Sequence, residues 1–95
     1  MPTNITQVED VERNKLLLRV EGELMLDDAI LLEKIALDMR ENTDRNLTLD
    51  LSDLSLMDSE SAPIVKRLRQ EHGFEIEGLQ LFLQKVIDDA ENRAD

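Results

Sequence analysis

The spacing of apolar and polar residues predicts strands in the first quarter of the chain. Residues 5–9 form a short mixed segment, and residues 15–20 contain a nearly continuous apolar run. The polar residues between them, near positions 12–14, predict a tight turn, because two strand-like runs with a short polar connection are typical of a β-hairpin. Gly22 is expected to close the second strand.

A helix and then a third strand follow. Asp27 and Asp28 could provide an N-cap and place negative charge near the positive end of the helix dipole. The next apolar residues recur at helical spacing, and we expect this set to face the core: Leu31, Leu32, Ile35, Ala36 and Met39. The polar stretch 41–46 should end the helix. Residues 47–52 alternate with period two, which predicts a strand with Leu47, Leu49 and Leu51 on one side.

The second half of the chain repeats this alternation of helix and strand. A loop after Asp58 should lead to a helix from Ala62 to about Glu71 that packs through Ile64, Val65 and Leu68. Gly73 is suited to end that helix, and residues 74–77 predict a short strand. A last amphipathic helix is predicted from apolar residues at helical spacing: Leu79, Phe82, Leu83, Val86 and Ile87.

The predicted order is therefore β-β-α-β-α-β-α. Strands separated by helices imply right-handed crossovers and parallel pairing, whereas the hairpin adds an antiparallel edge. We predict an α/β fold with a mixed, mostly parallel four-stranded sheet and about three helices. With 95 residues, the chain should form a single domain, 1–95, with residues 88–95 as a frayed polar tail.

Composition narrows the possible partners and locations. The formal net charge is −11, which disfavours nucleic acid and anionic membrane surfaces, because both require clustered basic residues. Such a charge can keep a small domain soluble, or it can suit a partner with a basic docking face. The absence of cysteine excludes disulfides and thiolate metal sites, and no apolar run is long enough to span a membrane. We expect a cytoplasmic protein without membrane insertion.

Two segments resemble the STAS domain, the module of anti-sigma-factor antagonists. Residues 20–24, Val-Glu-Gly-Glu-Leu, correspond to the Gly-Glu-Leu that follows the second strand in that family. Residues 49–59, Leu-Asp-Leu-Ser-Asp-Leu-Ser-Leu-Met-Asp-Ser, resemble its Leu-Asp-Leu-Ser-Gly-Val-x-Phe-Ile-Asp-Ser. The resemblance implies the same element order and a non-enzymatic regulatory role in protein–protein interaction and signalling.

The resemblance also implies a phosphorylation motif, which this chain alters. Phosphorylatable members read Asp-Ser-Ser-Gly, and their second Ser receives phosphate from a partner anti-sigma kinase. Here Asp58 and Ser59 are kept, Glu60 replaces the phosphoacceptor, and Ser61 replaces the Gly. Glu60 is either a fixed, partial mimic of phosphoserine or an acidic residue that favours a helix start. Pro63 should lie in the first helical turn, which makes Glu60 or Ser61 the N-cap.

The altered motif is the expected docking site for a protein partner. The face should combine Ser59, Glu60 and Ser61 with exposed apolar atoms of Met57 and Pro63. Its full set of residues is Met57, Asp58, Ser59, Glu60, Ser61 and Pro63. Ser59 and Ser61 are candidate phosphorylation sites, because both lie at a helix start. The expected partner is an anti-sigma kinase-like protein, a sensor or a transporter component, and the standard phosphoserine switch is expected to be absent.

Two other functions fit parts of the sequence. The chain could be a cytosolic STAS accessory subunit of a transporter or a lipid-transport ATPase. It could also be an acyl or peptidyl carrier protein, because the chain is acidic and Asp58-Ser59 precedes a helix. Catalysis is not expected, since no histidine is placed to activate Ser59. Asp50, Asp53 and Asp58 resemble a phosphate- or metal-binding set, but other receiver-domain residues are missing, so we expect no metal or cofactor.

Overall fold

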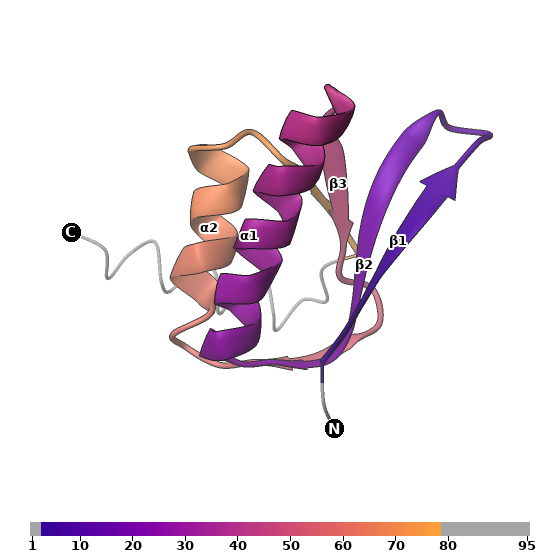
Figure 1. Cartoon of the computed structure of the whole chain (residues 1–95). Coiled ribbons are helices and arrows are strands. Elements are labelled where there is room, and N and C mark those ends of the chain that lie inside the picture. Colours follow the sequence, from indigo (N-terminus) through magenta and orange to yellow (C-terminus); the bar gives the residue numbers. More distant parts are fainter. Residues whose placement is uncertain (1–2, 79–95) are drawn as a thin grey trace.

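The computed structural model describes residues 3–78, which form five strands and two helices. In chain order they are β1 (Asn4–Asp10), β2 (Lys15–Leu24), α1 (Leu26–Thr43), β3 (Leu47–Asp50), β4 (Leu54–Met57), α2 (Ala62–Gln70) and β5 (Glu75–Glu77). The two helices lie side by side against the sheet (Figure 1). The predicted third helix and the tail 88–95 lie outside the described residues.

The sheet is mixed and mostly parallel, as predicted. Its main order is β1-β2-β3-β5, and β4 pairs with the end of β2. The hairpin pair β1–β2 is antiparallel, whereas β2–β3, β2–β4 and β3–β5 are parallel. The predicted number of four strands is wrong, because residues 54–57, which were assigned to no strand, form an additional one.

That additional strand exists because β2 continues past Gly22, which was expected to end it. Gly22 has φ +89°, and the register shifts between Gly22 and Glu23. Glycine accommodates this left-handed backbone without a Cβ clash. β2 therefore pairs first with β3 and, after the irregularity, with β4, where Leu24 lies opposite Met57. The end of β2 is thus brought beside the end of β4.

Helix α1 uses a different set of apolar residues from the predicted one. Its buried residues are Ala29, Leu32 and Ala36, while Ile35 and Met39 pack partly against the core. The predicted burial of Leu31 is wrong, since this side chain is 49% exposed. The helix begins at Leu26, and Asp27 and Asp28 lie in its first turn, where negative charge is favoured.

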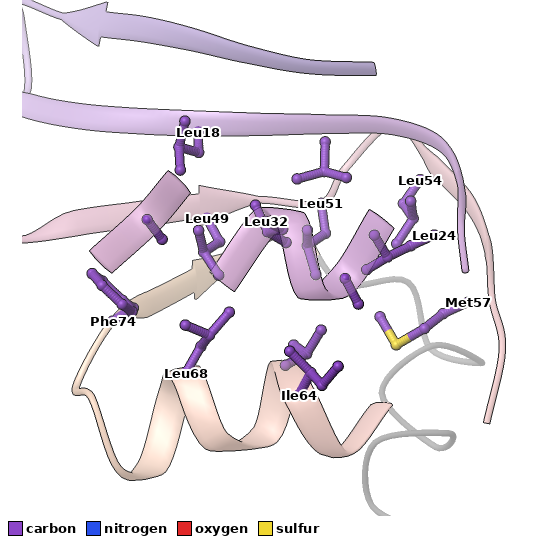
Figure 2. Close-up of a cluster of buried hydrophobic side chains, with 14 of the residues drawn as sticks. Leu18, Leu24, Leu32, Leu49, Leu51, Leu54, Met57, Ile64, Leu68 and Phe74 are labelled. Carbon is purple, nitrogen blue, oxygen red and sulfur yellow. The ribbon is translucent and has the colours of Figure 1, made fainter. Parts of the chain in front are cut away.

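Helix α2 agrees closely with its prediction. Ile64, Val65 and Leu68 are buried, and Pro63 lies in the first turn. Gly73 follows the helix with φ +74°, the left-handed conformation typical of a helix end. Phe74 is buried just before β5. Figure 2 shows Phe74 and Leu68 in the same apolar cluster as Leu32 of α1.

The core lies between the sheet and the two helices and is almost entirely aliphatic. Leu24, Leu32, Leu49, Leu51 and Leu54 are fully buried within it. Side chains from β2, β3, β4, α1 and α2 all contribute to this cluster (Figure 2). The sheet is therefore held to both helices by burial of apolar surface, which is the main stabilising term in small domains.

Ion pairs connect the hairpin to the distant strand β5. Arg13 Nη1 lies 2.8 Å from Glu77 Oε1, and Lys15 Nζ lies 3.1 Å from Glu75 Oε2 and 3.2 Å from Glu77 Oε1. Hydrogen bonding to Lys15 holds the pKa of Glu75 below its usual range, and hydrogen bonding to Arg13 does the same for the pKa of Glu77. These carboxylates are more acidic in the folded protein than in an unfolded chain.

Gly78 and Gly73 allow a matched test of packing at the end of β5. Both have φ near +75°, but a Cβ at Gly78 would lie 2.5 Å from Ser52 Cβ, whereas one at Gly73 would meet nothing within 4 Å. Gly73→Ala should cost about 1 kcal/mol from backbone strain alone, and Gly78→Ala about 2 kcal/mol or more. Urea unfolding of both variants checks this. Equal losses would contradict the close contact with Ser52.

The ion pairs predict a pH dependence of stability. Because folding lowers the pKa of Glu75 and Glu77, their stabilisation is present above the unfolded pKa and is lost as pH falls through the folded pKa. Lys15→Met should therefore lower stability at pH 7, and its difference from wild type should shrink below about pH 4. Urea unfolding across pH tests this, with exposed Lys34→Met as the control for losing one positive charge.

Candidate functional site

The altered motif forms the turn between β4 and α2, and Asp58 fixes that turn to the start of α1. Asp58 is half-buried. Its Oδ2 accepts a hydrogen bond from the backbone N–H of Leu26 at 3.2 Å, and its Oδ1 accepts one from the N–H of Ser61 at 2.8 Å. Met25, the N-cap residue of α1, makes no side-chain cap bond. A carboxylate from a distant turn therefore satisfies a free N–H at the start of α1.

The carbonyl group of Leu24 is the second anchor of this turn. It accepts a hydrogen bond from the N–H of Asp58 at 3.2 Å and another from Ser61 Oγ at 3.1 Å. Ser61 is fully buried, with 0% of its surface exposed. The buried side of the turn is thus attached to the junction between β2 and α1 by both backbone and side-chain hydrogen bonds.

The structure divides the predicted site residues into a buried and an exposed group. Ser59, Glu60 and Pro63 are exposed. The expectation that Met57 presents exposed apolar atoms is wrong, because it is only 4% exposed and packs in the core. Ser61 does not contribute to the outer face either, since its side chain is buried and its hydroxyl donates to the carbonyl of Leu24.

Of the two predicted N-cap residues, the structure selects Ser61. Helix α2 begins at Ala62, with Ser61 as N-cap and Pro63 at the second helical position. The Ser61 side chain does not cap this helix, because its hydroxyl donates to Leu24 instead. Glu60 lies exposed just before the N-cap, at the end of α2 where negative charge is favoured.

A shallow groove adjoins the turn along the outer side of α2. Its volume is about 430 Å³, and the described residues that line it are Pro63, Lys66, Arg67, Gln70 and Glu71. Arg67 makes two hydrogen bonds with Glu33 of α1, at 2.7 and 2.8 Å. This paired arrangement raises the pKa of Arg67 above its ordinary value and holds α1 beside α2. The turn between β4 and α2 therefore lies beside two helices, α1 and α2, that are joined by the pair of Glu33 and Arg67.

The three aspartates considered for metal or phosphate binding do not form one site. Asp50 accepts hydrogen bonds from Ser52 and pairs with Arg19, and Asp58 joins the helix starts. Within residues 3–78, no three histidine, aspartate or glutamate side chains are grouped so that they could hold a metal ion. None of the helices in that part of the chain is long and apolar enough to cross a membrane.

Comparison with known proteins finds likeness only at the level of structure. No family model matches the chain, and no curated protein matches it. A protein from Shewanella loihica PV-4 with a SpoIIAA-like fold is similar over 96% of this chain and 79% of its own, with 15% identity and a TM-score of 0.57. The anti-sigma factor antagonist SpoIIAA, in its unphosphorylated form, is similar over 99% of this chain and 100% of its own, with 17% identity and a TM-score of 0.50.

These likenesses establish the fold. The chain has a SpoIIAA-like fold, which confirms the α/β architecture implied by the sequence resemblance. The carrier-protein alternative is wrong, because carrier proteins resemble four-helix bundles, whereas the described residues contain a five-stranded sheet.

Asp58 should be required for stability, whereas its neighbour Ser59 should not. Asp58→Ala removes the acceptor of two backbone N–H groups and should lower the free energy of unfolding by about 1–3 kcal/mol. Asp58→Asn keeps one acceptor oxygen and should lose less. Ser59→Ala, at an exposed position in the same turn, should remain within about 0.5 kcal/mol of wild type. Urea unfolding gives all three values, and a neutral Asp58→Ala would contradict the anchoring role.

Proposed function

We propose that this chain is a non-enzymatic regulatory module that binds a protein partner through Ser59, Glu60 and Pro63. The observation that carries the proposal is the two-sided turn: Asp58 and Ser61 fix its inner side, and the outer side is exposed. A rigid, exposed turn loses little conformational freedom on binding, which favours affinity. A similar structure is that of an anti-sigma factor antagonist, which supports a role in signalling through protein contacts.

We also propose that the docking surface is constitutive. Glu60 occupies the place of the phosphoacceptor and is exposed, so a negative charge is present without a kinase. Ser61, the other hydroxyl that follows in the motif, is buried. Ser59 is the hydroxyl of the motif that faces outward, and a phosphate there would have to tolerate repulsion from Glu60 and Asp58. The partner would be an anti-sigma kinase-like protein, a sensor or a transporter component, met in the cytoplasm.

Reversing the charge of Glu60 should disrupt partner binding. Tagged full-length chain, expressed in its own host, should recover a specific partner, and Glu60→Lys should reduce that recovery about tenfold through lost charge complementarity. Glu12→Lys is the matched control, because Glu12 is also exposed but lies in the hairpin turn. It should recover the partner normally. Quantitative mass spectrometry of the captured proteins provides the measurement.

The same capture separates the possible outcomes. A kinase or sensor supports the antagonist-like role, whereas a transporter or ATPase component supports the accessory-subunit alternative. Intact mass of the captured chain should show no phosphate, and a phosphorylated Ser59 would contradict the constitutive surface. Equal recovery with Glu60→Lys would contradict docking through the turn, and equal loss with Glu12→Lys would indicate an effect of overall charge.

A further inference from the structure

The outward face of α1 begins with apolar side chains that the core does not use. Exposed positions recur every three or four residues along the helix, at Asp27, Ile30, Leu31, Lys34, Asp38 and Glu41. Ile30 is 53% exposed and Leu31 49%, and Met25, the N-cap residue, is 44% exposed. In the part of the chain that the structure describes, the other large exposed apolar residues are Leu56 and Val11. The start of α1 therefore carries three of the five large exposed apolar residues in the described part of the chain.

The start of α1, which carries this apolar surface, adjoins the turn of the proposed docking site. Asp58 bonds to Leu26 and Leu24, the two neighbours of Met25. One turn beyond Ile30, Glu33 pairs with Arg67 of α2. Figure 1 shows the starts of α1 and α2 at the same end of the molecule. Met25, Ile30 and Leu31, which we call the α1 apolar surface, thus lie at the end of the molecule that carries Ser59 and Glu60.

The charge at this end is acidic. Segments 21–32 and 51–65 together contain seven aspartate and glutamate residues and no lysine or arginine. The nearest cations along the chain are Arg19, Lys34, Lys66 and Arg67, and Arg67 pairs with Glu33 of α1. An apolar surface in a mostly acidic surrounding, with Asp27 and Glu60 exposed, complements a surface with an apolar centre and a basic rim.

We propose that the α1 apolar surface binds a basic protein segment that inserts an apolar side chain beside Ile30 and Leu31. This inference rests on the proposed function and specifies the chemistry of the partner. The apolar anchor side chain would supply affinity by losing contact with water. Lysine or arginine residues of the same partner segment would face Asp27 and Glu60. A second copy of this chain fits poorly, because it would bring the same acidic segments together. Nucleic acid fits poorly as well, because these acidic residues would repel its phosphates.

Site-specific photo-crosslinking of the full-length chain in its own host tests this proposal. Benzoyl-phenylalanine is placed at Ile30, at Pro63 or at Val11, where Val11 is an exposed apolar control in the hairpin turn, 81% exposed. We expect one shared adduct at Ile30 and Pro63 and none at Val11. Mass spectrometry of the crosslinked peptide from Ile30 should identify a partner segment with net positive charge.

The crosslinks at Ile30 and Pro63 distinguish failure of this inference from failure of the proposed function. An adduct at Pro63 without one at Ile30 would overturn the inference while supporting docking through the turn. No adduct at either position would overturn both. A crosslinked partner segment with net negative charge, or an adduct between two copies of this chain, would also overturn the inference.

Binding measurements with the identified partner add a second readout. The double variant Ile30→Ser, Leu31→Ser should weaken binding by about tenfold or more, because two apolar contacts are lost. Val11→Ser should remain within about twofold. Raising the salt concentration should weaken binding of wild type, as charge complementarity requires. A salt-independent affinity, or equal effects of the α1 and Val11 variants, would overturn the proposal.

Discussion

The carboxylate of Asp58 is the contact on which the proposed site depends. It accepts N–H groups from Leu26 and Ser61, so a single side chain joins the starts of both helices. This arrangement requires β4 to end beside the end of β2, and that requires the irregularity at Gly22. The glycine therefore determines where Asp58 lies, and Asp58 determines which side of the turn faces outward.

Local signals predicted most of the fold. The hairpin, both described helices and the strands around β3 and β5 follow from periodicity and turn residues. β4 was missed because its burial pattern does not alternate and because it forms only after β2 changes register. Leu31 was assigned to the core because helical spacing identifies an apolar band without showing its width. In the structure, the buried side of α1 is narrow and is centred on Ala29, Leu32 and Ala36.

The motif located the candidate site but not the direction of its side chains. Ser61 is buried because its hydroxyl donates to the carbonyl of Leu24, 37 positions earlier, and no local pattern encodes that contact. Met57 is buried because β4 pairs with β2. The same contacts leave Ser59 and Glu60 exposed beside an apolar face of α1 in an acidic surrounding. In the function that we propose, this phosphorylation-like motif serves as a docking surface whose negative charge comes from Glu60 and needs no kinase.

Amide hydrogen exchange of the full-length chain, alone and with its co-purified partner, tests most directly whether the partner docks through the turn between β4 and α2. The account predicts that binding slows exchange in peptides covering residues 24–32 and 58–66, the two segments that meet at the helix starts, and leaves the hairpin turn near Val11 unchanged. Protection confined to the hairpin or to β5, with residues 58–66 unaffected, would contradict docking through the turn.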